Sequence, residues 1–263
     1  MNTKKAAKKY LTEFLKIAPL SHALWRASEA INYGQVKLLG PALDLGCGFG
    51  EFAGVVFNRI EMGIDVNEEE LKQALTGKSY RKVKWADARK LPFKNSTFKT
   101  VLSVSVLEHI KGSEKVVYEA SRVLRKHGVF IFSVPTTSLY KSLLVPKILN
   151  SLGLRKWGDK YFELHCLAFK HVNLKPAKWW VKHLKKANFE IIEQHGTLSP
   201  TLVKLHEFFL ISAFPSQVWK LLFGKRLIMS VGLRTSILPI FFSRFVYNDF
   251  DSDINLFFIA KKK

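Results

Sequence analysis

The chain has 263 residues, 48% hydrophobic and 24% charged, so it can bury a sizeable core and is neither disordered nor collagen-like. Two cysteines are too few for a disulfide framework, which favours a reducing, cytoplasmic compartment. Lys and Arg number 42 against 21 Asp and Glu, and the resulting net charge of +21 favours an anionic partner, either nucleic acid or an anionic membrane face.

The positive charge is unevenly distributed along the chain. Residues 141–247 carry 17 basic and 5 acidic side chains, whereas residues 41–140 carry 15 and 11. We therefore expect the catalytic or ligand-binding core in the nearly balanced block and an electrostatic docking surface in the later one.

Residues 1–40 are predicted to form an N-terminal amphipathic helical segment. Glu13 and Lys16 interrupt the apolar stretch that a signal peptide needs. Near the C-terminus, the uncharged apolar run 208–219 is shorter than the ~20 residues that cross a bilayer. The apolar residues of the first helix recur at helical spacing: Tyr10, Leu11, Phe14, Leu15 and Ile17.

Short apolar segments alternate with amphipathic ones from residue 41 onward, which predicts an α/β fold with a doubly wound, largely parallel sheet. The predicted strands are Ala42–Leu45, Met62–Val66, Val83–Ala86, Phe98–Val104, Val129–Val134, Phe189–Gln194 and Leu256–Ala260. The predicted helices are Glu51–Phe57, one that begins after an Asn67 N-cap, Ser113–Arg125 with Ser113 as its cap, and Lys175–Ala187.

Two stretches, 136–174 and 198–248, do not fit this alternation. The second stretch contains apolar groups flanked by Lys and Arg, and it includes a Trp. This combination is typical of helices at a membrane interface. A cap folded over the active site would bury the same side chains within the protein, so both interpretations stay open. The apolar groups are Leu202, Leu205 and Phe208–Leu210; Trp219 and Leu221–Phe223; and Ile237, Leu238, Ile240–Phe242 and Phe245.

Gly46, Gly48 and Gly50 form a turn directly after the first predicted strand. Ligands of a doubly wound sheet bind near this turn, and glycine lets the backbone approach them closely. The pattern is not the dinucleotide fingerprint, because Glu51 stands where the third glycine belongs and would repel a pyrophosphate.

Carboxylates end three of the predicted strands: Asp44, Asp65 and Asp87. Asp65 lies about 20 residues after the glycine turn, where an acidic side chain can hold ribose hydroxyls. A cluster of carboxylates in so basic a protein suits a cationic ligand with hydroxyls, such as a sulfonium nucleoside.

Motifs in this order resemble those of class I S-adenosylmethionine (SAM)-dependent methyltransferases. The resemblance covers roughly residues 41–135 and the ending Asn255–Ala260, and its motifs are Leu43–Gly50, Gly63–Asp65, Ala86–Phe93, Val101–Ile110, Arg122–Gly128 and Phe132–Pro135. It implies a Rossmann-like seven-stranded sheet whose last strand is antiparallel, an α-helical insert before that strand, and SAM as cofactor. The implied domains are the helical segment 1–40, a SAM-binding domain of 41–197 and 249–263, a substrate-side segment 136–174, and a hydrophobic, basic helical insert 198–248.

The resemblance also implies a cofactor site. The turn Asp44–Gly50 would hold the methionine portion, Asp65 the ribose, and Asp87 with the Ala88 backbone the adenine edge. The complete expected set is Asp44, Gly46, Cys47, Gly48, Gly50, Asp65, Val66, Asp87, Ala88, Ser103 and Val104.

A hydroxyl acceptor would need a general base, and Glu108, His109, His165 and His171 are the candidates. Glu108 and His109 follow the fourth strand. The alternative interpretation is that they only pack against the loop and hydrogen-bond it. Quinone-precursor methyltransferases of this family carry Glu-x-x-Glu-His there and are thought to bind a divalent metal with it. Ser105 replaces the first Glu, so no metal is expected. We interpret Cys47 and Cys166 as packing residues.

The sequence therefore predicts a methyltransferase that acts on a hydrophobic or lipid-linked small molecule, at a hydroxyl. We expect it to be cytoplasmic and to act at or near a membrane surface, with attachment to an anionic membrane through 198–248 as one of the two open interpretations of the insert. One alternative is a nucleic-acid methyltransferase, disfavoured because Ser103–Val106 differs from the Asn/Asp-Pro-Pro-aromatic run of base-amine methyltransferases. The other is a non-catalytic binding module. The sequence carries no signal for an oligomeric state.

Overall fold

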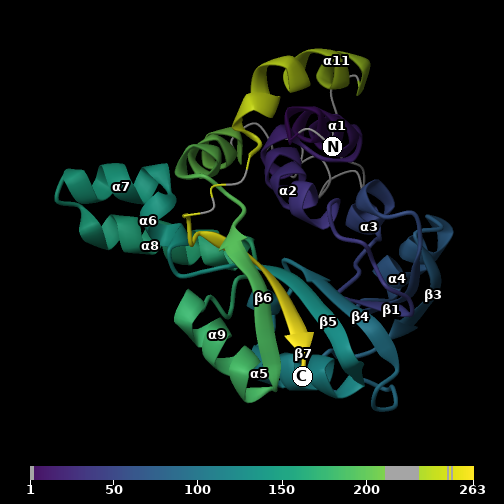
Figure 1. The fold of residues 1–263 in the computed structure, drawn as a ribbon. Helices are drawn as coiled ribbons and strands as arrows, with labels where there is room; N and C mark the ends of the chain where they lie inside the picture. Colours follow the sequence, from purple (N-terminus) through teal and green to yellow (C-terminus); the bar gives the residue numbers. More distant parts are fainter. Residues whose placement is uncertain (1–2, 211–230, 248, 250) are drawn as a thin grey trace.

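A seven-stranded sheet forms the centre of the fold (Figure 1). The computed structural model describes residues 3–210, 231–247, 249 and 251–263. The strand order is β3-β2-β1-β4-β5-β7-β6, and β7 lies antiparallel between β5 and β6. The α/β fold with an antiparallel last strand is confirmed. The strands are β1 Ala42–Leu45, β2 Ile60–Asp65, β3 Tyr80–Trp85, β4 Phe98–Val104, β5 Leu124–Pro135, β6 Phe189–Gly196 and β7 Asn255–Lys262.

Helices flank the sheet on both faces. The α-helices are α1 Thr3–Ile17, α2 Leu20–Tyr33, α3 Glu51–Val56, α4 Glu68–Thr76, α5 Ser113–Val123, α6 Leu139–Ser142, α7 Leu144–Ser151, α8 Arg155–Ala168, α9 Ala177–Lys186 and α11 Val231–Phe242. Residues 200–210 are also helical, and the short 3-10 helices are η1 Leu107–His109 and η2 Ser243–Phe245. No helix in the described ranges is long and apolar enough to cross a membrane.

Successive strand residues face opposite layers, as the pleat requires. Leu43 and Phe130 belong to a core that includes side chains of α5 and α9. Leu102 and Ile131 belong to a second core on the other face, with side chains of α2, α3 and α4. A third core joins α1 and α2 to residues 198–203 of the insert, so this part of the insert is integral to the fold.

Two predicted details of the elements are wrong. Gly112, with φ of 77°, is the N-cap of α5, and Ser113 lies buried in the first turn. Its hydroxyl instead accepts a hydrogen bond from Asn173 Nδ2. β5 begins at Leu124 rather than at Val129, because Leu124 pairs with Phe98 of β4 ahead of a register shift.

The insert divides into buried and exposed parts. Leu202 is fully buried, whereas Phe208 is 60% exposed. α11 packs against α1 at one end of the molecule (Figure 1), and the Arg234 guanidinium donates a hydrogen bond to the Leu15 carbonyl. The outer face of α11 exposes several apolar side chains: Val231, Leu233, Ile237, Ile240 and Phe241. The predicted apolar group Trp219–Phe223 lies outside the described residues.

Candidate functional site

The glycine turn leaves the carboxyl end of β1 with an unusual backbone conformation. Gly46, Gly48 and Gly50 have φ of 71°, 51° and 77°, values that residues with a Cβ rarely adopt. A Cβ on Gly46 would also overlap the side chain of Val106. The Gly46 and Cys47 amides both donate to the Ile64 carbonyl of β2 at 2.9 Å, which fixes the turn against the neighbouring strand.

A cavity of about 760 Å³ opens above this turn. Its volume lies in the range of ~300–1,000 Å³ typical of small-molecule sites. The strand ends form its floor, while Phe14 near the end of α1, Ala18 just after that helix, and His22 and Arg26 from α2 line another wall. Of the expected cofactor residues, those that line the cavity are Asp44, Gly46, Cys47, Gly48, Asp65, Val66, Asp87, Ala88 and Val104.

Gly50 and Ser103 belong to the expected set but are not among the lining residues. Gly50 is the N-cap of α3, and its α-carbon faces Tyr80 and Ala74. Ser103 is fully buried, and its carbonyl accepts a hydrogen bond of 2.9 Å from the Tyr33 hydroxyl. Both residues therefore support the cavity lining through packing and hydrogen bonds without facing the cavity.

Asp44 lies behind the turn and is only 7% exposed. Burial raises the pKa of its carboxyl to about 7, although the hydrogen bond from Tyr80 lowers it; the negative charge of Asp65 raises it further. A cation placed in the cavity would favour the ionised form of this carboxyl, because opposite charges attract strongly where water is excluded.

Asp65 at the end of β2 has two backbone partners. Its Oδ2 accepts from the Gly48 amide at 2.9 Å, and its Oδ1 accepts from the Asn67 amide at 3.0 Å. The carboxylate is thus fixed on the cavity wall by its own strand end and by the glycine turn. Asn67 caps α4, as predicted, by accepting from the Glu69 and Glu70 amides.

Asp87, expected at the adenine edge, forms an ion pair with Arg89 at 2.7 Å. The hydrogen bonds from the Arg89 side chain lower the pKa of the Asp87 carboxyl. Both residues line the cavity, so Arg89 covers part of the carboxylate that an adenine amine would otherwise meet.

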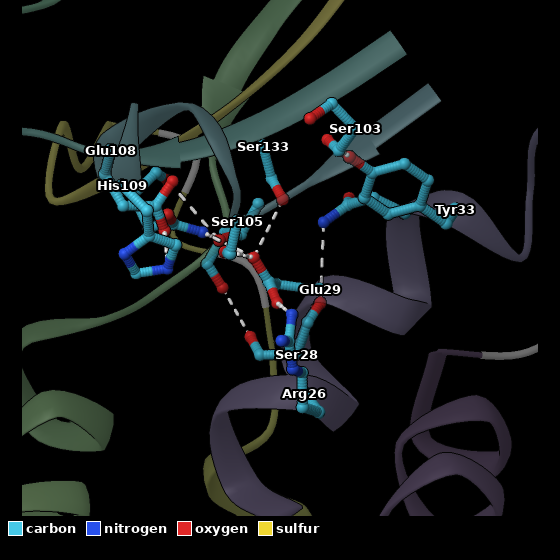
Figure 2. A network of polar contacts seen from close by, with 12 residues as sticks. Arg26, Ser28, Glu29, Tyr33, Ser103, Ser105, Glu108, His109 and Ser133 are labelled. Atoms are coloured by element: carbon cyan, nitrogen blue, oxygen red, sulfur yellow. Dashed lines mark hydrogen bonds and ion pairs between the residues drawn. The ribbon is translucent and has the colours of Figure 1, made fainter. Parts of the chain in front are cut away.

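Helix α2 contributes a buried carboxylate behind the cavity wall, shown in Figure 2. Glu29 is fully buried, and its Oε1 accepts hydrogen bonds from Ser105 at 2.5 Å and Ser133 at 2.8 Å. Its Oε2 pairs with Arg26 at 3.1 Å, and Asn255 of β7 donates to Oε1 at 3.2 Å. This network joins α2 to the ends of three strands and holds Arg26 at the cavity.

Glu108 and His109, two of the candidates for the general base, lie in η1, directly after β4. Glu108 is 1% exposed, burial raises the pKa of its carboxyl to about 8, and its Oε2 has no hydrogen-bond partner among the described residues. His109 Nδ1 lies 2.9 Å from the Lys170 carbonyl, which can only accept, so Nδ1 carries the proton and the neutral ring keeps its lone pair on Nε2. Burial lowers the pKa of His109.

A second cavity of about 130 Å³ adjoins the first. Glu108, His165 and His171 line only this smaller cavity, whereas His109 lines both. Burial lowers the pKa of His165 to about 4 and that of His171 to about 3, so both imidazoles are neutral at physiological pH. The four candidate catalytic residues are therefore close together, but only His109 faces the cofactor-sized space.

Sequence reasoning missed the contribution of the N-terminal helices to the cavity. The N-terminal helix was expected to be amphipathic, but the spacing of its apolar residues does not indicate that Phe14 would line a ligand site. The available signal was that Arg26 and Glu29 are the only Arg, Lys, Asp or Glu residues of α2.

The cavity fits SAM. The positive-φ glycine turn, whose first glycine leaves no room for a Cβ, provides a close backbone surface. Asp44 and Asp65 provide carboxylates for a cation and for ribose hydroxyls.

Comparisons with known proteins agree with this geometry. A family model for a methyltransferase domain matches residues 43–132. An uncharacterized protein of Methanocaldococcus jannaschii is 31% identical over 171 residues, 59% of this chain and 63% of that relative. The sterol 4-C-methyltransferase strm-1 of Caenorhabditis elegans is 38% identical over 100 residues, 34% of this chain and 29% of its own length.

A solved structure of a SAM-dependent methyltransferase from Thermotoga maritima has the same fold. The TM-score is 0.58 at 17% sequence identity, and the match covers 93% of this chain and 92% of that one. The match to the first relative thus spans less than two thirds of its length, whereas the fold is shared over nearly the whole chain. Residues 43–132 thus match the methyltransferase-domain family in sequence, and the chain shares the fold of a SAM-dependent methyltransferase structure.

Proposed function

We propose that the protein transfers the methyl group of SAM to a hydroxyl of a hydrophobic or lipid-linked small molecule at an anionic membrane surface. One observation carries the proposal. The cavity with the strand-end carboxylates is lined in part by residues at the end of α1, and α1 packs against α11, whose outer face is apolar and exposed. A membrane that contacted α11 would therefore lie near the cavity wall.

The cofactor supplies a methyl group already activated on a sulfonium, so the chain must mainly bind, align and exclude water. In this proposal Asp65 accepts hydrogen bonds from the ribose, and the glycine turn contacts the methionine portion. Asp44 faces the positive charge of the ligand in its ionised form. Asp87 and Ala88 lie at the adenine end, and Val66 contributes the cavity rim.

His109 is the candidate general base in this proposal. It lines the larger cavity, it is neutral near pH 7, and its Nε2 lone pair is available. Glu108 Oε1 lies 3.7 Å from Nε2, and its pKa of about 8 keeps this carboxyl mostly protonated near pH 7 while the ring is neutral. The imidazolium that forms once the ring takes the acceptor's proton would favour ionisation of Glu108 and be stabilised by it. His165 and His171 lie beyond His109, in the smaller cavity.

Three features support a hydrophobic acceptor at a membrane. The outer face of α11 exposes five apolar side chains, and residues 141–247 supply the strong positive charge that attracts anionic lipid. In the smaller cavity Trp25 and Phe169 offer aromatic faces to an acceptor, between the polar side chains that make up the rest of its lining. Finally, the C. elegans relative is by its name a sterol methyltransferase.

The test uses SAM labelled with tritium on the methyl group, incubated with the full chain and either a lipid extract or an RNA extract. We expect label in the lipid fraction, and none when His109→Ala replaces the wild-type protein at matched SAM binding. Label only in RNA would overturn the proposal in favour of a nucleic-acid methyltransferase. SAM binding without transfer to either extract would favour a binding module.

A further inference from the structure

The end of α8 turns so that three metal-ligating side chains meet. Lys170 has φ of 55°, its amide donates to the Leu167 carbonyl at 3.1 Å, and the His171 amide donates to the Cys166 carbonyl at 2.8 Å. This is the Schellman arrangement that ends many helices, and it brings His171 back over Cys166. One ligand atom each from His165, Cys166 and His171 lies within 4.8 Å of the other two.

The two imidazoles of this cluster lack the partners that buried polar groups normally have. His165 is 7% exposed, and neither of its ring nitrogens has a hydrogen-bond partner within the described part of the chain. The same is true of His171 Nδ1. An unsatisfied buried polar group costs about 1–3 kcal/mol, so such a group calls for a ligand or another explanation.

The surrounding residues orient the rings. His165 packs between Phe162 and Phe169, with ring centroids 6.2 and 4.6 Å away. His171 stacks on His109 at 5.6 Å. The Val172 and Asn173 amides both donate to the Glu108 carbonyl, at 3.0 and 2.9 Å, which fixes the segment after His171 against η1. The cluster is therefore built into the packing rather than left on a loose loop.

We propose that His165, Cys166 and His171 form a site for a divalent transition metal, with Zn²⁺ as the best match to the donor set. One thiolate and two imidazoles are ligands that Zn²⁺ prefers over the oxygen-seeking Mg²⁺ and Ca²⁺. Zn–N and Zn–S bonds of about 2.0–2.3 Å require the three ligand atoms to approach to roughly 4 Å or less. Metal binding would therefore require small rotations of the Cys166 and His171 side chains, both of which are half-buried.

Three protein ligands leave a fourth position open, which is the arrangement of catalytic rather than structural zinc. His165 and His171 line the 130 Å³ cavity, whose residues His109, Arg26 and Ser105 also line the larger cavity. The positive charge of Arg26 is offset by its ion pair with Glu29. A hydroxyl bound at the open position would have its pKa lowered and would lie next to the methyl-transfer site. This role rests on the proposed function, whereas metal binding itself does not.

The site is tested by metal binding without SAM or acceptor. The full chain is stripped with chelator, titrated with Co²⁺ as a spectroscopic probe, and reconstituted with Zn²⁺ for elemental analysis. We expect one equivalent of metal and a thiolate-to-cobalt charge-transfer band. Cys166→Ser should abolish the band, and His171→Ala should remove stoichiometric binding. The matched control is Cys47→Ser, since the chain has only two cysteines, and it should keep the band.

Circular dichroism verifies that each variant is folded, and adenosylhomocysteine binding verifies it further for the Cys166 and His171 variants, which lie outside the cofactor cavity. A folded wild-type protein that takes up no stoichiometric Zn²⁺ or Co²⁺ would overturn the metal site. Loss of the band in Cys47→Ser but not in Cys166→Ser would do the same. If metal binds as expected but no acceptor is methylated, the metal site stands and the proposed methyl transfer fails.

Discussion

The Tyr80 hydroxyl donates a hydrogen bond of 2.6 Å to Asp44 Oδ2, directly behind the glycine turn. Asp44 is the penultimate residue of β1, and Tyr80 is the first residue of β3. The bond therefore links β1 to β3 across β2, which lies between them in the sheet. Tyr80 is buried, and both burial and the nearby Asp44 charge raise the pKa of its phenol, which keeps it a donor. The Asp44 carboxyl, with its pKa of about 7, is consequently near half protonation at neutral pH in the ligand-free protein.

The first prediction concerns the pH dependence of SAM binding. A cationic ligand binds the ionised carboxylate more tightly, so binding must release the proton from Asp44 below pH 7. SAM affinity should rise about tenfold per pH unit below about pH 7 and level off above it. Calorimetry from about pH 5 to pH 8 measures this slope. Asp44→Asn should flatten the profile, and an equally steep profile in that variant would contradict the assignment.

The second prediction concerns Asp65. Asp65→Ala removes a carboxylate that accepts from the ribose hydroxyls in the proposed complex, and hydrogen bonds to charged groups contribute about 1.5–3 kcal/mol. Affinity for adenosylhomocysteine should fall about 10- to 100-fold in calorimetry, with the circular dichroism spectrum preserved. Glu68→Ala, at an exposed position in the first turn of α4, is the matched control and should bind normally. Unchanged affinity in Asp65→Ala would place the ribose elsewhere.

A third prediction compares two glycines with similar backbones. Gly46 and Gly153 have φ of 71° and 75°, but a Cβ on Gly153 would meet no atom within 4 Å, whereas on Gly46 it would overlap Val106. Gly153→Ala should lower the free energy of unfolding only by the conformational cost of about 1–2 kcal/mol. Gly46→Ala should lose more stability in urea unfolding and should also lose SAM binding. Equal losses of stability in the two variants would show that the Val106 contact does not constrain the turn.

The sequence was most informative where local chemistry decides the structure. β1 and β4 have the predicted bounds, and Asn67 caps α4. These features depend on short apolar runs and a local side-chain cap. The antiparallel last strand is also present, although it was expected only from the family resemblance. The start of β5 was missed, because it is set by the pairing of Leu124 with Phe98 of β4. These two residues are 26 positions apart in the sequence, so no local pattern indicates the contact.

The candidate site was predictable only in its cofactor half. The glycine turn and strand-end acids lie within continuous motifs, and most of them line the cavity. Arg26, Glu29 and Phe14 come from helices that precede the first strand, and their position depends on tertiary packing. Cys166 was interpreted as a packing residue, because nothing in the spacing shows that the helix end returns His171 to it.

The buried Glu29 supports a fourth prediction. Glu29→Ala would leave the Arg26 charge and the Ser105, Ser133 and Asn255 donors without their acceptor. Breaking a buried ion pair in this way costs about 3–5 kcal/mol, which urea unfolding measures. Glu13→Ala breaks the Glu13–Lys16 pair on the surface of α1 and should cost at most about 1 kcal/mol. Similar small losses in both variants would mean that the network in Figure 2 contributes little to stability.

The last prediction separates membrane contact from folding. Deleting 198–248 is unsuitable as a test, because Leu198, Leu202 and Val203 are fully buried in the core with α1 and α2. Ile240 and Phe241 are instead 63% and 56% exposed on α11, so they are available to a lipid surface without unfolding the chain.

Ile240→Ser together with Phe241→Ser should weaken binding to anionic vesicles by at least about 100-fold, given the ~1.5–3 kcal/mol that burial of each of the two large apolar side chains contributes. Vesicle flotation at low and high salt measures the effect. Leu75→Ser, on the exposed face of α4 and 50% exposed, removes a comparable side chain and should leave flotation unchanged. Undiminished flotation of the double variant would exclude this face of α11 as the membrane contact, and salt-sensitive binding would then point to the basic side chains alone.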